Sequence, residues 1–244
     1  MNFDFPVYVI STKRFSDRHE SVERQLSMMG LSFEFIFLYD ADEIDELTIE
    51  KYGLSKLKVE VASTVLKHLE AHRRLLATNA RYGLILEDDF FFQGVAVSDL
   101  QLVITEILQI PPPWLLFLGG MDNKRSFLEY VKNTIIQKGE ITTAEAYLIE
   151  RQSAEARLEW VETHGINMPA DHLLKYIDSK LCIPQYICTN PLFGQFSITG
   201  KFRSELDEYR QGKSALWLIL RFRLRNFFRQ ALPRRLAAVL RYIC

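Results

Sequence analysis

The stretch YGLILEDDFFF, residues 82–92, places three consecutive carboxylates between two hydrophobic walls. Residues 83–86 have the apolar character of a buried strand, and the phenylalanines at 90–92 follow the acidic group. Ligands of open α/β sheets bind beyond the carboxyl ends of the strands, where Glu87, Asp88 and Asp89 would lie. A solvated surface turn needs neither apolar wall, so this position favours a functional site.

Successive residues of a strand point to opposite faces of its sheet, so Glu87 and Asp89 can share one side while Asp88 faces the other. Two neighbouring carboxylates repel each other unless a positive charge lies between them. Hard divalent cations such as Mg²⁺ and Mn²⁺ prefer oxygen ligands and commonly bridge to substrate phosphates. We therefore expect Glu87 and Asp89 to bind such a metal ion.

Strand and helix patterns alternate on both sides of this stretch. Apolar strand patterns occupy residues 7–11, 32–41, 83–86, 114–120, 146–149 and 183–188. Helical periodicity separates the first four, in segments that begin near Ser16 and Ser98 and around Val65, and Pro169 opens a further short helix. The order β-α-β-α-β-α-β predicts an α/β fold with a mostly parallel sheet and helices on its faces.

Composition limits the class of protein. The 244 residues are 48% hydrophobic and 25% charged, as in ordinary globular domains, and the net charge of −1 gives no reason to expect nucleic acid. Three cysteines without metal-ligand spacing favour a reducing compartment. The N-terminal residues read as a strand and not as a signal peptide, and no run of about 20 apolar residues occurs. We expect a cytoplasmic protein.

Residues 214–244 differ from the rest of the chain in charge. They contain seven arginines and no acidic residue, which leaves a formal charge of −8 on residues 1–213. The pattern predicts two short amphipathic helices split at Pro233. Basic helices that carry Trp and Phe are typical of membrane interfaces, so this tail is expected to bind the membrane, with packing on the acidic body or on a second copy as the alternative. We therefore divide the chain into a domain at 1–213 and a tail at 214–244.

Several motifs together resemble glycosyltransferase family 25, the bacterial lipopolysaccharide and lipooligosaccharide galactosyltransferase-like group. In chain order they are VYVISTKRFSDR with Arg14 and Arg18, Asp40 in YDAD, Lys67–His68, LILEDD at 84–89, EAYLIERQSAEA with Tyr147 and Ala154, and PAD at 169–171. The resemblance extends from residue 7 to about residue 198. The chain departs from the family where Lys67 replaces the usual Ser, and where VAST at 61–64, with Glu60 one position early, replaces Glu-Ile-Gly-Cys.

The resemblance implies a GT-A-like, Rossmann-type fold and a metal-dependent enzyme. Such an enzyme would use Mn²⁺ or Mg²⁺ to transfer a hexose, most typically galactose, from a UDP-sugar to a lipid-linked oligosaccharide, with inversion. The acceptor places it peripherally on the inner face of the cytoplasmic membrane. The implied metal residues are Glu87 and Asp89. The expected substrate contacts are Arg14, Arg18, Asp40, His68, Asp88, Gly119, Gly120 and His172.

Inverting transfer also needs a base that takes the proton of the acceptor hydroxyl. Asp171 is the first candidate, although a carboxylate at a helix start can equally serve as a cap. Arg14 and Arg18 suit phosphate contacts, but a solvated helix face is an equal alternative for Arg14. His68 can be a core histidine, and Gly119–Gly120 can be a turn. Two other functions remain open: a nucleotidyltransferase, and a catalytically inactive, membrane-docked scaffold.

Overall fold

The computed structural model describes residues 4–93, 97–120, 125–199, 201–202 and 214–243. Seven strands form one sheet in the order β2-β1-β3-β7-β5-β8-β6. Their bounds are β1 Val7–Ile10, β2 Glu34–Ile36, β3 Tyr82–Glu87, β5 Leu115–Phe117, β6 Ile136–Lys138, β7 Ala146–Glu150 and β8 Gln185–Cys188. Strands β7 and β6 run antiparallel to the other five. The predicted α/β fold with a mostly parallel sheet is confirmed.

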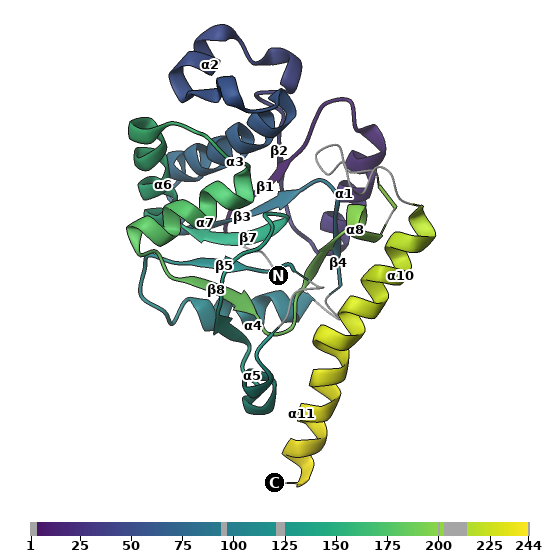
Figure 1. The fold of residues 1–244 in the computed structure, drawn as a ribbon. Helices are drawn as coiled ribbons and strands as arrows, with labels where there is room; N and C mark the ends of the chain where they lie inside the picture. The colour runs from purple at the N-terminus through teal and green to yellow at the C-terminus, as the bar shows by residue number, and fades with distance from the viewer. Residues whose placement is uncertain (1–3, 94–96, 121–124, 200, 203–213, 244) are drawn as a thin grey trace.

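Helices cover both faces of this sheet (Figure 1). The helical segments are α1 Ser16–Met28, η1 Ala41–Glu43, α2 Glu46–Tyr52, η2 Leu54–Lys56, α3 Val59–Ala77, α4 Val97–Ile107, α5 Phe127–Lys132, α6 Arg151–His164, α7 Ala170–Leu181, α8 Phe196–Thr199, α10 Ala215–Asn226, η3 Phe227–Ala231 and α11 Leu232–Ile243. A separate two-stranded ribbon pairs β4 (Phe90–Phe92) with β9 (Phe193–Gln195).

Alternation along the strands divides the core into two layers. Val7 and Val9 pack with α1 and α4 on one face, whereas Tyr8 and Ile10 pack with α3 and α6 on the other. In β3, Leu84 and Leu86 follow the first face. Because side chains alternate with a period of two, Glu87 then points toward α3, and Asp88 points toward α1. The fold therefore separates these two neighbouring carboxylates.

The second predicted strand is shorter than its sequence pattern. Residues 32–41 were expected to be extended, but β2 ends at Ile36 and Tyr39 has a left-handed φ of 70°. The hydroxyl of Ser63 donates to the Tyr39 carbonyl at 2.6 Å, and the backbone N–H of Lys13 donates to Asp40 at 3.0 Å. These two bonds hold the turn that brings Asp40 to the carboxyl end of β1.

The tail forms one continuous helix, so the predicted split at Pro233 is wrong. The helix α10 passes through the π-helical turn η3 into α11, and Pro233 is the second residue of α11 (Figure 1). A proline ring clashes with the carbonyl four residues before it in a regular α-helix. The carbonyl four residues before Pro233 belongs to Arg229, which lies within the π turn, where hydrogen bonds span five residues and not four.

This long helix packs on the body of the protein. Leu218, Gln230 and Ala237 are buried, and the Gln230 side chain donates to the Gly120 carbonyl at 3.0 Å. Near the end of α11, Arg241 donates to the carbonyl of Tyr130 at 2.8 Å and to the Asn133 side chain at 2.7 Å. In the described part of the chain, no helix combines the length and apolar character needed to cross a bilayer.

The buried ion pair between Arg157 on α6 and Asp178 on α7 yields a prediction about stability. Arg157 Nε and Nη2 donate to the two carboxylate oxygens at 2.7 and 2.5 Å, and neither side chain is more than 1% exposed. Arg157→Met leaves the Asp178 carboxylate uncompensated, so the free energy of unfolding should fall by about 3–5 kcal/mol in urea denaturation.

The matched control is Arg74→Met, because Arg74 forms ion pairs with Glu34 and Glu70 at the surface. That variant should lose less than about 1 kcal/mol. Equal losses in the two variants would contradict the assigned importance of the buried pair.

Candidate active site

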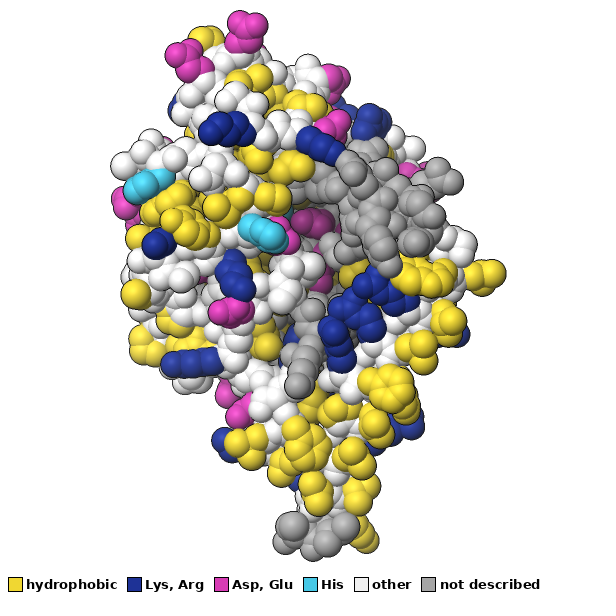
Figure 2. Space-filling model, in the orientation of Figure 1, with side chains coloured by type: hydrophobic (Ala, Val, Ile, Leu, Met, Phe, Trp, Pro, Cys, Tyr) yellow, Lys and Arg dark blue, Asp and Glu magenta, His cyan; other side chains and the backbone are white. Residues whose placement is uncertain are grey.

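A cleft of about 940 Å³ lies at the carboxyl ends of β1 and β3. Its walls come from the loop between β1 and α1 and the start of α1, from η1, from the first half of α3, from the turn after β3, from the segment before β7, from the start of α7, and from β9 and α8. Figure 2 shows acidic side chains at the base of a hollow on the visible face. The sequence-predicted site residues that line this cleft are Arg14, Arg18, Asp40, Glu87, Asp88, Asp89, Asp171 and His172.

Asp88 is neutralised by residues on the α1 side of the sheet. Arg18 donates from Nη1 to Oδ1 at 2.7 Å, and the Ser11 hydroxyl donates to Oδ2 at 2.5 Å. The Ser11 oxygen also lies 2.9 Å from His19 Nε2. Both oxygens of Asp88 are thus engaged within the protein, and they join the end of β3 to the start of α1.

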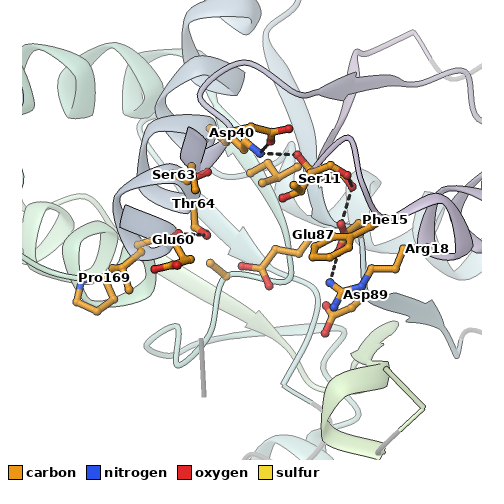
Figure 3. Close-up of a pocket in the computed structure, with 18 of the residues that line it drawn as sticks. Ser11, Phe15, Arg18, Asp40, Glu60, Ser63, Thr64, Glu87, Asp89 and Pro169 are labelled. Carbon is orange, nitrogen blue, oxygen red and sulfur yellow. Dashed lines mark hydrogen bonds and ion pairs between the residues drawn. The ribbon is translucent and has the colours of Figure 1, made fainter. Parts of the chain in front are cut away.

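Glu87 points into the middle of the cleft (Figure 3). Gln195 donates from Nε2 to its Oε2 at 3.1 Å, and His68 Nε2 lies 3.5 Å from its Oε1. The side chain of Glu87 is 23% exposed, whereas that of Asp88 is 8% exposed. The Glu87 carboxylate is therefore held by a hydrogen bond and remains accessible to a ligand bound in the cleft.

Asp89 is a buried carboxylate with unused hydrogen-bonding capacity. Its Oδ2 accepts from the backbone N–H of Ser197 at 3.4 Å, and its Oδ1 is buried without a hydrogen-bond partner. Burial, and after it the negative charge of Glu87, raises the pKa of Asp89 to about 6. A cation beside Asp89 would reverse both the desolvation penalty and the repulsion.

The donor set fits a Mg²⁺ or Mn²⁺ ion that is shared with a phosphate ligand. Within the described residues, no group of three or more His, Cys, Asp or Glu side chains is arranged to hold a metal alone. Such ions are commonly bound through one or two carboxylates together with substrate phosphates and water. Glu87 and Asp89, which has an oxygen without a partner, supply two carboxylates for such an ion. That this pair binds a metal ion stays a prediction.

Asp40 lines the cleft but is tied to a buried lysine. Lys67 forms an ion pair with Asp40 Oδ1 and donates to the Ser11 carbonyl at 2.6 Å. Lys67 is only 2% exposed, and burial lowers its pKa. The lysine that departs from the family motif thus has a structural partner, and it removes most of the negative charge of Asp40 from the cleft.

Two arginines and an aromatic ring form the rim beside the acidic residues. Arg18 lies over the ring of Phe15, with 4.1 Å between the guanidinium carbon and the ring centroid, and Arg14 lies 5.2 Å from the same ring. Arg18 also forms an ion pair with Asp88. Lys13, at the same rim, forms an ion pair with Glu43. This side of the cleft combines cationic groups with a flat apolar surface.

The opposite wall comes from the starts of α3 and α7. Glu60 and Thr64 belong to α3, and Asp171 and His172 belong to α7. Asp171 accepts the backbone N–H of His172 at 2.9 Å, which satisfies a donor in the first turn of α7. Its carboxylate therefore has a capping contact and also lines the cleft, so the structure leaves both interpretations of Asp171 open.

Three sequence-predicted site residues do not line the cleft. His68 is 1% exposed and lies behind Glu87. Gly119 and Gly120 approach Glu145: the Gly120 N–H donates to Glu145 Oε1 at 2.7 Å, and a Cβ on Gly119 would lie 2.2 Å from that oxygen. The close backbone approach at these glycines is toward a buried carboxylate of the protein itself.

Sequence reasoning missed several residues of the site. Ser11, Glu60, Thr64, Gln195 and Ser197 line the cleft but were not among the candidates. Helical periodicity was visible only from Val65 onward, whereas α3 begins at Val59, one and a half turns earlier. Gln195 and Ser197 lie 108 residues from their partners Glu87 and Asp89, so no local pattern connects them.

A family model described as "Glycosyltransferase family 25 (LPS biosynthesis protein)" matches residues 4–174. No curated protein has a significantly similar sequence.

Among solved structures, a glycosyltransferase involved in glycosylation of the major capsid of PBCV-1 is 11% identical, with 90% of this chain and 98% of that chain covered and a TM-score of 0.42. The galactosyltransferase LgtC, in complex with donor and acceptor sugar analogs, is 13% identical over 70% of this chain and 69% of that one, with a TM-score of 0.35. The CMP:2-keto-3-deoxy-manno-octonic acid synthetase complexed with CTP is 12% identical over 75% and 88%, with a TM-score of 0.39. These distant likenesses do not identify a substrate.

The raised pKa of Asp89 predicts how stability depends on pH. The pKa is about 6 in the folded protein and near 3.8 in the unfolded chain, so the folded state binds more protons between these values. The free energy of unfolding therefore decreases as pH rises from about 4 to 6, by up to about 3 kcal/mol. Asp89→Asn keeps an acceptor for Ser197 but has no carboxyl group to ionise, so its free energy of unfolding does not fall in this way. The variant should therefore unfold at a higher temperature than the wild type at pH 8.

At pH 4 the two proteins should unfold at nearly the same temperature. Scanning calorimetry without divalent cations at both pH values measures the difference. A variant that is less stable than the wild type at pH 8 would contradict the assignment of Asp89 as a desolvated carboxylate.

Proposed function

The chain belongs to glycosyltransferase family 25, and we propose that it transfers a hexose, preferentially galactose, from a UDP-sugar to a lipooligosaccharide or lipopolysaccharide acceptor with inversion. The family assignment makes it a glycosyltransferase of lipopolysaccharide biosynthesis, which acts with a nucleotide sugar and an oligosaccharide acceptor. The donor, the metal dependence and the stereochemistry are proposals. The observation that supports them best is the pair Glu87 and Asp89: the charge of Glu87 helps to raise the pKa of Asp89, and Asp89 Oδ1 is buried without a hydrogen-bond partner.

We assign the donor diphosphate to the side of the cleft between this pair and the arginine rim. Glu87 and Asp89 would hold a Mn²⁺ or Mg²⁺ ion, which stabilises the negative charge of the departing diphosphate when it is bound. Arg14 and Arg18 would contact phosphate oxygens from the other side, because a guanidinium binds them in a bidentate manner. Phe15 offers its ring to the flat base of the nucleotide. Asp88 and Asp40, which are tied to Arg18 and Lys67, shape this part of the cleft.

We assign the acceptor to the wall formed by the starts of α3 and α7. A hydroxyl there would face Glu87 across the cleft and lie beside Asp171, which lines the same wall. In a single displacement with inversion, the acceptor oxygen forms a bond to the anomeric carbon as the bond from that carbon to the diphosphate breaks. Asp171 takes the hydroxyl proton in this step. His172, Glu60 and Thr64 supply hydrogen-bonding groups for the acceptor sugar.

The tail gives the proposed enzyme a surface toward the membrane. Side chains two positions from the buried Leu218 lie about 200° around the helix, and these are Leu216 and Leu220, which are 80% and 57% exposed. The outer stripe of the helix consists of the exposed apolar residues Leu216, Leu220, Leu224, Phe228, Leu236, Val239 and Leu240. Figure 2 shows apolar side chains along the outer edge of this helix and basic side chains next to them.

An exposed apolar stripe on a helix segment that carries seven arginines and no acidic residue matches an anionic lipid surface in both polarity and charge. The acceptor that the family assignment implies is itself anchored in a membrane. We therefore propose that the helix lies on the inner face of the cytoplasmic membrane and keeps the cleft near its acceptor.

A panel of nucleotide sugars with Mn²⁺ tests the proposed reaction. One UDP-sugar should raise the unfolding temperature and be consumed in the presence of a lipooligosaccharide acceptor. Asp89→Ala should abolish the Mn²⁺-dependent part of this stabilisation, because it removes a metal ligand. Asp171→Asn should keep the stabilisation and lower transfer by about 10²–10⁴-fold, because it removes only the base.

The matched control is Asp42→Asn, a substitution at the outer part of the cleft that leaves all proposed contacts in place. Absence of a response to any nucleotide sugar, or an unchanged response in Asp89→Ala, would refute the proposal. Equal transfer rates in Asp171→Asn and the wild type would assign the base to another residue.

Flotation with anionic liposomes tests the proposed membrane surface. Replacing Leu220, Leu224 and Phe228 together by Gln should reduce the bound fraction at least roughly tenfold, because three apolar side chains that would be buried in lipid are lost. The matched control is the triple variant Met28→Gln, Leu47→Gln, Leu102→Gln, which removes three apolar side chains elsewhere that are each more than half exposed. An unchanged bound fraction in the tail variant, or a tail variant that only dissociates a dimer, would contradict the membrane proposal.

A further inference from the structure

Three buried side chains form a row behind Glu87. His68 Nδ1 lies 2.9 Å from the hydroxyl oxygen of Tyr147, and His72 Nε2 lies 3.2 Å from the same oxygen. His68 Nε2 faces Glu87 Oε1 at 3.5 Å. His68, His72 and Tyr147 are each no more than 1% exposed, so water cannot replace a missing partner. The row therefore runs from the core between α3 and β7 to the carboxylate at the centre of the cleft.

Burial favours the neutral form of both imidazoles in the row, because neither is more than 1% exposed. Burial lowers the pKa of His68 to about 3 and that of His72 well below its usual value, and the nearby Arg157 acts in the same direction. A neutral imidazole carries one N–H donor and one acceptor nitrogen, and the tyrosine hydroxyl has a single proton to donate. Two arrangements of protons use the tyrosine proton in one contact and a histidine N–H in the other; a third, in which both histidines donate to the oxygen, leaves the buried Tyr147 O–H without an acceptor in this row.

In the first arrangement, His72 Nε2–H donates to Tyr147, and Tyr147 donates to His68 Nδ1. His68 then carries its proton on Nε2, directed at Glu87 Oε1. In the second, His68 Nδ1–H donates to Tyr147, and Tyr147 donates to His72 Nε2. The lone pair of His68 Nε2 then faces the carboxylate. With Glu87 ionised, the first arrangement places a donor against an acceptor, whereas the second places two acceptors together.

The far end of the row favours the same arrangement. His72 Nδ1 is buried without a hydrogen-bond partner. In the first arrangement this nitrogen is an unpaired acceptor, but in the second it carries a proton with no acceptor. Buried backbone N–H groups without a partner are rarer than carbonyl groups without one, and the same preference at this nitrogen favours the first arrangement.

We propose that Tyr147 and His72 fix His68 as the Nε2–H tautomer, and that His68 is a positioning residue for the Glu87 carboxylate. Gln195 donates to the other oxygen of Glu87 at 3.1 Å, so one oxygen of the carboxylate is held by Gln195 and the other faces His68. The 3.5 Å separation is longer than a formed hydrogen bond, and such contacts tighten when a ligand binds. The role of Glu87 rests on the proposed function, whereas the tautomer of His68 does not.

Nitrogen-15 NMR of the histidine side chains in the intact protein measures the tautomer directly. Signals are assigned by replacing each of the five histidines in turn, with His164→Gln as the control because His164 stacks on Trp160 away from the row. His68 should appear as the Nε2–H tautomer in the wild type. In Tyr147→Phe, which removes the hydroxyl, it should become a mixture of the two tautomers.

Affinity for Mn²⁺, measured by calorimetry without donor, and steady-state kinetics test the positioning role. His68→Leu should weaken Mn²⁺ binding and lower kcat by about 10–100-fold, with the KM for the acceptor unchanged. His68→Gln places an amide N–H near the position of Nε2 and should restore most of both. Rescue by Gln but not by Leu separates a hydrogen-bonding role from a packing role.

An Nδ1–H tautomer of His68 in the wild type would overturn the proposal. Equal effects of Leu and Gln at position 68, or unchanged Mn²⁺ affinity in His68→Leu, would overturn the positioning role. A wild type that shows the expected tautomer but binds neither Mn²⁺ nor any nucleotide sugar would instead refute the proposed function.

Discussion

The crowding of carboxylates at the end of β3 is the constraint on which the site depends. Three acidic residues in succession follow a buried strand, and each must be compensated in a different direction. Alternation turns Asp88 toward α1, where Arg18 and Ser11 neutralise it. Glu87 turns toward α3, where Gln195 donates to it, and Asp89 accepts the backbone N–H of Ser197. The charge of Glu87 helps to raise the pKa of Asp89, so these two neighbouring carboxylates form an arrangement that a divalent cation shared with a diphosphate can complete.

Buried basic residues decide which acids remain available for chemistry. Lys67 holds Asp40, and Arg157 holds Asp178, so two further carboxylates are compensated within the protein. Arg157 also lies close enough to His68 and His72 to disfavour their protonation. The neutral state of these histidines lets the row through Tyr147 act as a hydrogen-bond donor to Glu87 and not as a competing cation. The same buried charges that stabilise the packing of α6 and α7 thus influence the electrostatics of the cleft.

Periodicity predicts the parts of this structure that are set by local physics. Apolar runs followed by helical repeats gave the order of β1, α1, β3, α4 and β5, and the position of the acidic group at a strand end gave Glu87, Asp88 and Asp89. The pattern of residues 32–41 was too long because side-chain bonds from Ser63 and to Asp40 end the strand early. Gln195 and Ser197 were not predictable, since their contacts join segments 108 residues apart. The predicted split at Pro233 was wrong because a proline normally ends a helix, whereas here the helix continues from a π turn through the proline.

Anomalous scattering from Mn²⁺ in crystals grown with the UDP-sugar donor would locate the metal ion directly. We expect one Mn²⁺ peak in the cleft, within coordination distance of carboxylate oxygens of both Glu87 and Asp89 and of the donor diphosphate. We also expect that Asp88 remains bound to Arg18 and Ser11 and does not contact the ion. A donor bound in the cleft without a metal, or a Mn²⁺ peak on Asp88 or Asp40 in place of Glu87 and Asp89, would contradict the proposed metal site.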